Sequence, residues 1–401
     1  MRRMLTSVIA ITLTVALFAG RADRANAQQV WGAPWCGGQP QISSVMDHDL
    51  PNFSKNQIVR LYTGSDKWNC KDAKSITFNA SDGHEGWDYT RATRRQGCGT
   101  GKRDGLAMDL IYAASDGTVF RSRWDEAAHD GGAAHYGLYL DIDHGGDGPM
   151  RSLYGHLAAV FVEEGKDVAQ GQLIGALGTT GHSTGPHLHF HASKGDDATI
   201  SSNVLDIYGW CRDWTSFNCP YPGFPDPHRG DGWSQRLIRP SQPGAKCPGG
   251  CGSVEIDDAS PSVTFRCGAG VDCPHWYGSP TGFHGGHRYT FQNGRTKDYY
   301  VQYRCPECGP GTYLIEANVP LGATAHIARY EIARKVTIMD QHEEKVWHPL
   351  GIFSFTGVPM VELNDRTDRY DWGFDASSQY RIAADVIRFT RICTDVPPGV
   401  G

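Results

Sequence analysis

The residues best suited to chemistry lie between positions 181 and 191, in the run Gly-His-Ser-Thr-Gly-Pro-His-Leu-His-Phe-His. A loop rich in Gly, Ser and Pro leads here into alternating imidazole and apolar side chains, which is typical of a β-strand. Alternate residues of a strand point to one face, so we expect His187 and His189 side by side, with His191 as a third. Neighbouring imidazoles on one face suit a site that holds a divalent metal and transfers protons.

Two further motifs add to this group. His84-Glu85-Gly86-Trp87-Asp88 offers an imidazole nitrogen and a carboxylate oxygen, both good zinc ligands. Leu153-Tyr154-Gly155-His156-Leu157 places one more histidine in a short strand. Taken alone, the first motif is more often an exposed loop, and a lone strand histidine is more often an ordinary half-buried residue. The presence of all three motifs within residues 84–191 favours a shared site.

The elements that must position these side chains are β-strands. Leu138, Leu140 and Ile142 alternate with polar residues, which indicates a half-buried strand. Two apolar runs on either side of Ser115-Asp116-Gly117 predict a hairpin. Residues 81–200 show no sustained helical periodicity, so we expect a small antiparallel β-domain there.

The three motifs resemble those of the M23 family of zinc metallopeptidases, of the lysostaphin or LytM type. The marks of that family are a His-x3-Asp, a Tyr-Gly-His-Leu-like segment and a terminal His-x-His. Here they are His84-x3-Asp88, Tyr154-Gly155-His156-Leu157 and His187-Leu188-His189. The resemblance covers roughly residues 81–195.

The resemblance implies a role for each matching residue. His84, Asp88 and His189 would bind Zn2+, and His156 and His187 would be the catalytic histidines. Two histidines and one carboxylate leave a fourth zinc position open for a water, the pattern of a catalytic site. The implied function is a secreted zinc metalloendopeptidase that hydrolyses the peptide cross-links of peptidoglycan through a zinc-activated water.

The chain also departs from the family pattern. His191 stands where the family often has an acidic residue after the His-Leu-His-Phe run. An insertion rich in Arg, Gly and Cys at residues 91–105 and a second one around residues 125–134 would reshape the surroundings of the site.

Two other functions compete with the peptidoglycan hydrolase. One is a non-catalytic protein that binds cell wall or glycan through a degenerate M23 fold. The other is a protease of Gly-rich proteins. The presence of all five matching positions favours an enzyme, and the sequence leaves the scissile bond open.

The beginning of the chain predicts export. Arg2 and Arg3 precede an apolar stretch, residues 5–19, that is too short to span a bilayer comfortably. Ala25-Asn26-Ala27 matches a signal-peptidase cleavage site, so residues 1–27 are interpreted as a signal peptide. We therefore expect a secreted, extracellular or periplasmic protein with no membrane span after cleavage.

The net charge of the chain limits the classes of partner that it is expected to bind. The formal net charge is −6, and removing residues 1–27, which hold four arginines and one aspartate, takes it to −9. Such an acidic chain is unsuited to nucleic acid as its main partner. Neutral glycans and peptide polymers remain compatible with it.

The 12 cysteines all follow the signal segment. An even number of cysteines in an exported chain predicts disulfides, whose connectivity does not follow from the sequence. The alternative is a second zinc site built from Cys247-x3-Cys251 and Cys305-x2-Cys308. Export favours disulfides over that alternative.

The second half of the chain is again β. Short strands with turns between them, including a hairpin predicted at Asn293-Gly294, indicate a sandwich or jelly roll. Three segments, 311–315, 347–353 and 382–389, resemble the golvesin C-terminal or xanthan-lyase carbohydrate-binding-like domain. That resemblance implies binding of a glycan, against the alternative of a purely structural domain whose aromatic residues form its core.

The predicted fold class is therefore all-β, a small antiparallel peptidase domain followed by a β-sandwich. We expect two separable halves, each large enough to bury a core. The predicted segments are 1–27 (signal peptide), 28–80 (a lead-in that packs on the peptidase), 81–205 (peptidase), 206–254 (a linker rich in Pro, Gly and Cys) and 255–395 (sandwich).

Overall fold

The computed structural model describes residues 31–37, 41–46, 58–60, 66–68, 79–80, 84–90, 110–124, 136–145, 150–183, 185–195, 197–199, 203–205, 207, 238, 244, 247–271, 275–292, 296–342, 347–367 and 380–394. These residues form 26 β-strands and no α-helix, which confirms the all-β fold class. The predicted signal peptide and both predicted insertions lie outside the described residues. Within the described part of the chain, no helix has the length and apolar character needed to cross a membrane.

The first sheet carries the histidine-rich motif. Its strands follow the order β11-β7-β8-β9-β13-β5-β1-β4, and β14 pairs with β13. All described pairings in it are antiparallel except that of β1 with β4. Its members are β1 (Gln41–Val45), β4 (Asn79–Ala80), β5 (Trp87–Thr90), β7 (Gly117–Trp124), β8 (Leu138–Asp143), β9 (Met150–Gly155), β11 (Asp167–Val168), β13 (Leu188–Lys194) and β14 (Val204–Leu205).

Alternation of side chains gives this sheet one apolar face. Leu138, Leu140 and Ile142 are fully buried in the same core cluster, as their spacing predicts. Leu188 and Phe190 of β13 enter that core too, so His189 and His191 point to the opposite face. The hydrophobic pattern therefore fixes which face of the sheet carries the histidines.

The second sheet draws strands from both halves of the chain. Its order is β16-β19-β24-β21-β22-β10-β12-β6. Its members are β6 (Leu110–Tyr112), β10 (Leu157–Val160), β12 (Leu173–Leu177), β16 (Val263–Cys267), β19 (Tyr299–Arg304), β21 (Ala328–Ile332), β22 (Lys335–Met339) and β24 (Met360–Asn364).

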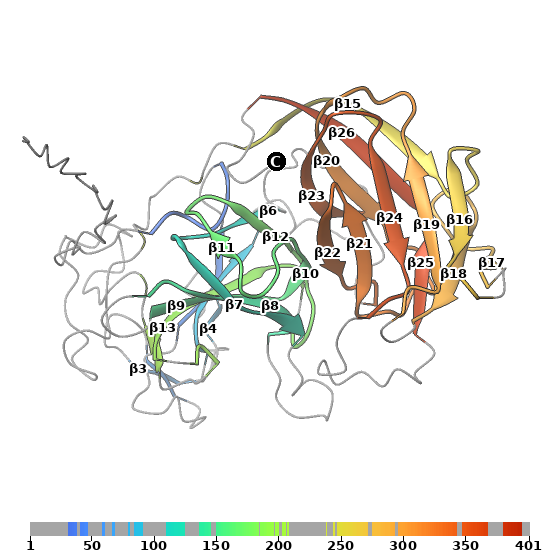
Figure 1. The fold of residues 1–401 in the computed structure, drawn as a ribbon. Helices are drawn as coiled ribbons and strands as arrows, with labels where there is room; N and C mark the ends of the chain where they lie inside the picture. Colours follow the sequence, from blue (N-terminus) through green and yellow to red (C-terminus); the bar gives the residue numbers. More distant parts are fainter. Residues whose placement is uncertain are drawn as a thin grey trace, which may run out of the picture.

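The junction between the halves in this sheet is the pair β10–β22. Ala159 lies opposite Met339, and Val160 lies opposite Ile338, in antiparallel register. Just beyond β22, the backbone N–H of Asp340 donates to the carbonyl of Ala158 at 3.1 Å. Figure 1 shows this contact, where the green strands of the first half adjoin the orange and red strands of the second.

The remaining strands complete the C-terminal sandwich. A four-stranded sheet, β15-β26-β20-β23, packs with the C-terminal strands of the second sheet around a core that includes Tyr303, Tyr330 and Phe389. A three-stranded sheet, β17-β18-β25, adjoins it, and β2 pairs with β3. The bounds are β2 (Ile58–Arg60), β3 (Asp66–Trp68), β15 (Gly249–Asp257), β17 (Tyr277–Ser279), β18 (His287–Phe291), β20 (Gly311–Asn318), β23 (Trp347–Phe355), β25 (Arg381–Ala384) and β26 (Val386–Thr394).

Both predicted hairpins are wrong in their pairing. The strands around Ser115-Asp116-Gly117 are β6 and β7, but β6 pairs with β12 and β7 pairs with β8. Likewise, β18 and β19 flank Asn293-Gly294 and belong to different sheets. In each case the chain passes from one sheet to another at the turn, which is how a layered β-fold buries both layers.

Two of the described disulfides join distant parts of the chain, and a third closes a short loop. Cys36 is bonded to Cys247, Cys251 to Cys393, and Cys305 to Cys308. The disulfide interpretation therefore holds for these cysteines. The alternative zinc site is wrong, because all four cysteines proposed as its ligands form disulfides.

Candidate metal centre and catalytic histidines

Asp88 and His189 are brought together by strand register. In the β5–β13 pair they lie directly opposite each other, so their side chains leave the same face of the sheet. Nδ1 of His189 lies 3.0 Å from Oδ1 of Asp88. The apolar residues that flank them enter the core, which holds both polar side chains in place.

His84 reaches the same carboxylate from the segment before β5. Its Nε2 lies 3.1 Å from Oδ1 of Asp88, and its Nδ1 lies 3.4 Å from Oγ of Ser44. The close fit requires a glycine at position 86, where an added Cβ would lie 2.8 Å from the ring of His189. The three donor atoms of His84, Asp88 and His189 all lie within 4.8 Å of one another.

His191 fixes the proton on His189. Nε2 of His191 lies 2.9 Å from the carbonyl of Ala198, which only accepts, so this nitrogen carries a hydrogen. Burial lowers the pKa of His191, so the ring is neutral and its Nδ1 is an acceptor. Nε2 of His189, at 3.1 Å, therefore donates to that Nδ1. The consequence is that Nδ1 of His189 carries a lone pair.

This lone pair faces an ionised carboxylate. Burial opposes ionisation of Asp88, yet the neighbouring imidazoles, His84 first, hold its pKa well below its usual range. Burial also lowers the pKa of His189 to about 3. Two lone pairs at 3.0 Å repel each other unless a cation lies between them. Donors on one tetrahedral zinc lie about 3.3 Å apart, so the separations here fit a zinc ion.

His156 and His187 lie beside this donor set in a different orientation. Nδ1 of His156 donates to the carbonyl of Thr180 at 2.8 Å, and Nδ1 of His187 donates to that of Gly185 at 2.6 Å. In neutral rings this leaves both Nε2 atoms as proton acceptors. The two ring centroids are 4.5 Å apart, and Nε2 of His187 lies 3.7 Å from Oδ2 of Asp88.

The backbone at His156 is unusual. Its φ of 59° lies in the left-handed region, which few residues other than glycine adopt. Its N–H donates to the carbonyl of Tyr136 at 2.7 Å, which holds this conformation. Strained backbone of this kind gathers at functional sites. Burial, followed by the charges of His187 and His189, lowers the pKa of His156 to about 3, so the ring is neutral near pH 7 and its Nε2 has a free lone pair.

A close backbone contact supports both histidines. Gly137, at φ 61°, packs so tightly on Thr180 that an added Cβ would lie 2.4 Å from a backbone atom of that residue. The hydroxyl of Thr180 also accepts the N–H of Leu138 at 3.0 Å and donates to the carbonyl of Leu157 at 2.9 Å. The loop before His187 is thereby fixed to β8 and to β10, which begins directly after His156.

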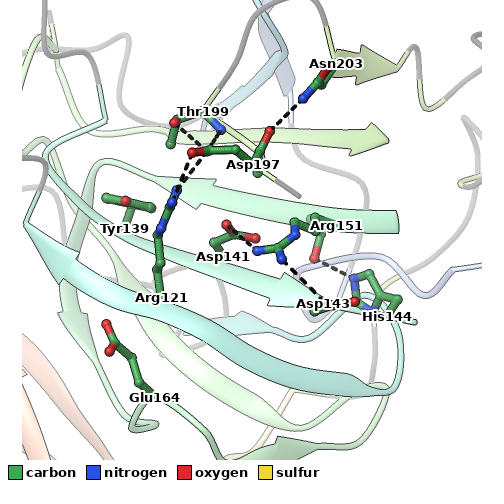
Figure 2. A network of polar contacts seen from close by, with 12 residues as sticks. Arg121, Tyr139, Asp141, Asp143, His144, Arg151, Glu164, Asp197, Thr199 and Asn203 are labelled. Atoms are coloured by element: carbon green, nitrogen blue, oxygen red, sulfur yellow. Dashed lines mark hydrogen bonds and ion pairs between the residues drawn. The ribbon is translucent and has the colours of Figure 1, made fainter. Parts of the chain in front are cut away.

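The segment that carries Ala198 is held by a network of polar contacts. Arg121 of β7 donates twice to Asp197, at 2.7 and 3.0 Å, and the N–H of Thr199 donates to the same carboxylate. Figure 2 shows this pair, with Arg151 nearby between Asp141 and Asp143. The network therefore fixes the carbonyl of Ala198, which in turn orients His191.

All five residues predicted for the site converge in the structure, and the sequence analysis missed their supports. Glu85 accepts a hydrogen bond from the hydroxyl of Tyr136, whose ring centroid lies 5.3 Å from that of His189. His191 is fully buried behind His189. The departure from the family pattern at His191 was the one sequence signal that pointed to any of these contacts.

Comparison with known proteins covers part of the chain. Residues 103–200 match Peptidase family M23. DD-carboxypeptidase/endopeptidase Mpg of Neisseria meningitidis is 42% identical over 88 residues, which are 22% of this chain and 20% of that protein. Glycyl-glycine endopeptidase ALE-1 of Staphylococcus capitis is 40% identical over 80 residues, 20% of each protein. The chain thus spans about a fifth of the length of these curated relatives.

Among solved structures, the catalytic domain of lysostaphin from Staphylococcus simulans matches 31% of this chain and 74% of its own, with 27% sequence identity and a TM-score of 0.23. The family match includes His156, His187 and His189. It begins after His84 and Asp88, which the strand pairing brings to the other three. Residues 103–200 are thus an M23 peptidase family domain, with relatives of the lysostaphin type.

Proposed function

We propose that this protein is a secreted zinc metalloendopeptidase that hydrolyses peptide cross-links of peptidoglycan. The observation that carries the proposal is the convergence of Nε2 of His84, Oδ1 of Asp88 and Nδ1 of His189 beside two histidines with unprotonated Nε2 atoms. A closed structural metal site has no use for such neighbouring proton acceptors.

Each residue has a distinct task in this proposal. His84, Asp88 and His189 hold zinc, which when bound supplies Lewis acidity that makes a water nucleophilic near neutral pH. His156 and His187 take the proton of the attacking water at Nε2 and return it to the leaving amine. The protonated imidazole also stabilises the negative charge that develops on the scissile carbonyl oxygen.

The names of the relatives support a cell-wall substrate. One is named a DD-carboxypeptidase/endopeptidase, another a peptidoglycan DD-endopeptidase, and a third a glycyl-glycine endopeptidase. We therefore propose a peptide bond of a peptidoglycan cross-link as the substrate class. A glycine-rich bridge is the second candidate, favoured by the glycyl-glycine relative.

Digestion of purified sacculi tests the proposal. The zinc-loaded full-length chain is expected to release muropeptides whose masses show hydrolysed cross-links. A chelator should abolish release, added zinc should restore it, and His156→Ala should release nothing. Sacculi that bind the protein without any release would instead identify a non-catalytic wall-binding protein. Cleavage of a glycine-rich polypeptide but not of sacculi would identify the second candidate.

We propose further that the C-terminal sandwich binds a surface glycan. Tyr277 is 43% exposed and lies next to Tyr289 and Phe291, with ring centroids 5.5 and 5.9 Å away. An exposed ring that lies beside two half-buried rings forms an aromatic surface of the kind found at binding sites. Tyr277→Ala is expected to weaken co-sedimentation with sacculi, whereas Leu321→Ala, at an apolar position that is still more exposed, should not. Equal binding by both variants would contradict the proposal.

A further inference from the structure

Three aspartates gather at one end of the C-terminal sandwich. Asp257 ends β15, Asp258 follows it, and Asp385 lies between β25 and β26. One carboxylate oxygen from each lies within 4.8 Å of the others. The first and last strands of the sandwich, β15 and β26, pair here, since Asp257 lies opposite Val386. Three acidic side chains from two distant segments are therefore held in one place by the sheet.

Asp385 shows that this group is incompletely satisfied. The residue is 3% exposed, and its Oδ2 accepts the N–H of Phe283 at 2.9 Å. Its Oδ1 is buried and has no hydrogen-bond partner among the described residues. A buried carboxylate oxygen without a partner is costly, and native proteins pair such atoms with donors or with metal ions.

The surrounding donors do not supply the missing partner. His284 and the N–H of Ala259 each reach an oxygen of Asp257, at 2.8 and 2.9 Å. The side chain of His284 is 53% exposed, so solvent weakens its charge at this site. The backbone N–H of Arg288 hydrogen-bonds to Asp258, which is 7% exposed. Among the described residues of this cluster, the oxygen left without a donor is therefore Oδ1 of Asp385.

The three carboxylates also affect one another electrostatically. Burial, together with the charges of Asp258 and Asp257, raises the pKa of Asp385 to about 7. Burial and the charge of Asp257 likewise raise the pKa of Asp258 to about 6. Carboxylates this close repel one another when ionised, and a bound cation removes that repulsion.

We propose that Asp257, Asp258 and Asp385 bind a calcium ion. Calcium takes oxygen ligands at about 2.3–2.6 Å, so two ligands of one ion lie at most about 5 Å apart, and three carboxylate oxygens within 4.8 Å of one another can share one ion. The donors are all oxygen, whereas the His84, Asp88 and His189 group is rich in nitrogen and suits zinc. Magnesium demands shorter and more regular coordination and is the weaker fit.

The ion would tie three parts of the sandwich together. It joins the end of β15 to the junction of β25 and β26, and through Asp385 it holds the segment that carries Phe283. The ring of Phe283 is 44% exposed and packs edge-on against Trp347, with centroids 5.1 Å apart. Calcium would therefore order an aromatic surface residue as well as the strands.

Calorimetric titration of calcium chloride into the zinc-loaded full-length chain tests this site. We expect about one calcium per chain with a Kd of about 10⁻⁵–10⁻³ M, and a melting temperature that rises with calcium concentration. Asp385→Asn and Asp258→Asn should each weaken calcium binding at least about tenfold, because each removes a charged ligand.

Two controls make the test decisive. Asp365→Asn changes another fully buried aspartate of the sandwich that lies outside the cluster, and it should leave calcium affinity unchanged. His84→Ala should also leave it unchanged, so the result is independent of the proposed peptidase activity. The proposal is overturned if calcium up to about 10 mM produces neither saturable heat nor a rise in melting temperature. It is also overturned if Asp385→Asn and Asp258→Asn bind calcium as the unaltered chain does.

Discussion

The five residues of the proposed peptidase site divide by the direction in which their nitrogens face. His84 and His189 each turn one ring nitrogen toward the carboxylate of Asp88. His156 and His187 instead donate hydrogen bonds from Nδ1 to backbone carbonyls, which leaves Nε2 available to the proposed substrate. This division, visible only in the hydrogen bonds, separates the proposed metal ligands from the proposed proton-transfer groups.

The first prediction follows from that division. His84→Ala and Asp88→Ala should lose bound zinc, because each removes one of three ligands. His156→Ala and His187→Ala should retain about one zinc per chain and lose about 10²–10⁴-fold in turnover. Elemental analysis after dialysis and the rate on a soluble peptide measure both effects. Wild-type zinc content in the two ligand variants would refute the assignment.

The second prediction concerns His191 as a positioning residue. His191→Phe should weaken zinc affinity about 10–100-fold, because the ring of His189 loses the acceptor that fixes its tautomer. His191→Gln should recover most of the affinity, since its amide both accepts from His189 and donates to the carbonyl of Ala198. Competition with a chromophoric chelator measures the affinities. If Gln and Phe weaken zinc equally while both proteins fold, the side chain acts only by filling space.

At the scale of elements, the sequence predicted which side chains of a strand share a face. It did not predict which strands pair with each other. The alternation at Leu138, Leu140 and Ile142 and the His-x-His run indicated the correct faces, because a strand repeats every two residues. The hairpin signal at Ser115-Asp116-Gly117 described a turn but not the partners of β6 and β7. Pairing is set by packing of the layers, and a turn carries no information about it.

The candidate site could also be predicted from the sequence only in part. Spacing and family resemblance were enough to bring together the five proposed residues. His191 contacts Ala198 and Glu85 contacts Tyr136, and both of these partners lie in segments whose local sequence has no recognised pattern. The carbonyls that orient His156 and His187 are also invisible in a sequence, because every residue has one.

A third prediction belongs to the segment after β24. Asp365 is fully buried, and burial raises its pKa to about 7, whereas an unfolded chain has a value near 3.9. The folded protein therefore holds this proton more tightly than the unfolded protein does. The stability it contributes is present below about pH 4 and is lost as the pH rises through about 7.

Asp365→Asn should remove this dependence. The amide oxygen can still accept the N–H of Asp298, which lies 3.0 Å from the carboxylate, and it carries no charge to desolvate. The variant should melt at a higher temperature than the unaltered chain at about pH 8 and at a similar temperature at about pH 4. Thermal melts across that range give the two curves, and parallel curves would contradict the role given to Asp365.

At the scale of the whole molecule, the pair β10–β22 bears on how independent the two halves are. Two separable domains joined by a linker would let a chain ending near Asp206 cleave a small peptide at full rate. That truncation would expose the edge of β10, which begins directly after His156. It would also uncover Trp124, whose ring lies 4.9 Å from that of His326.

The fourth prediction is therefore that the truncated chain loses activity on soluble peptide as well as on sacculi. The expected loss is accompanied by aggregation or a lowered melting temperature, because an open strand edge and apolar surface are exposed. Peptide hydrolysis and thermal melts of both lengths measure this. A truncated chain that melts like the full-length protein and cleaves peptide at full rate would restore the picture of two separable domains.

The pairing of Ala159 with Met339 has a consequence for the order of events during synthesis. The two residues are 180 positions apart, so β10 has no partner on that side until most of the sandwich has been made. At about 5–20 residues per second, the later strand emerges about 10–40 s after the earlier one. The disulfide between Cys36 and Cys247 likewise waits on residues from the second half. If the proposed activity needs this pairing, as the fourth prediction states, a partly synthesised chain is inactive and the cell that makes it is protected until the sandwich has been made.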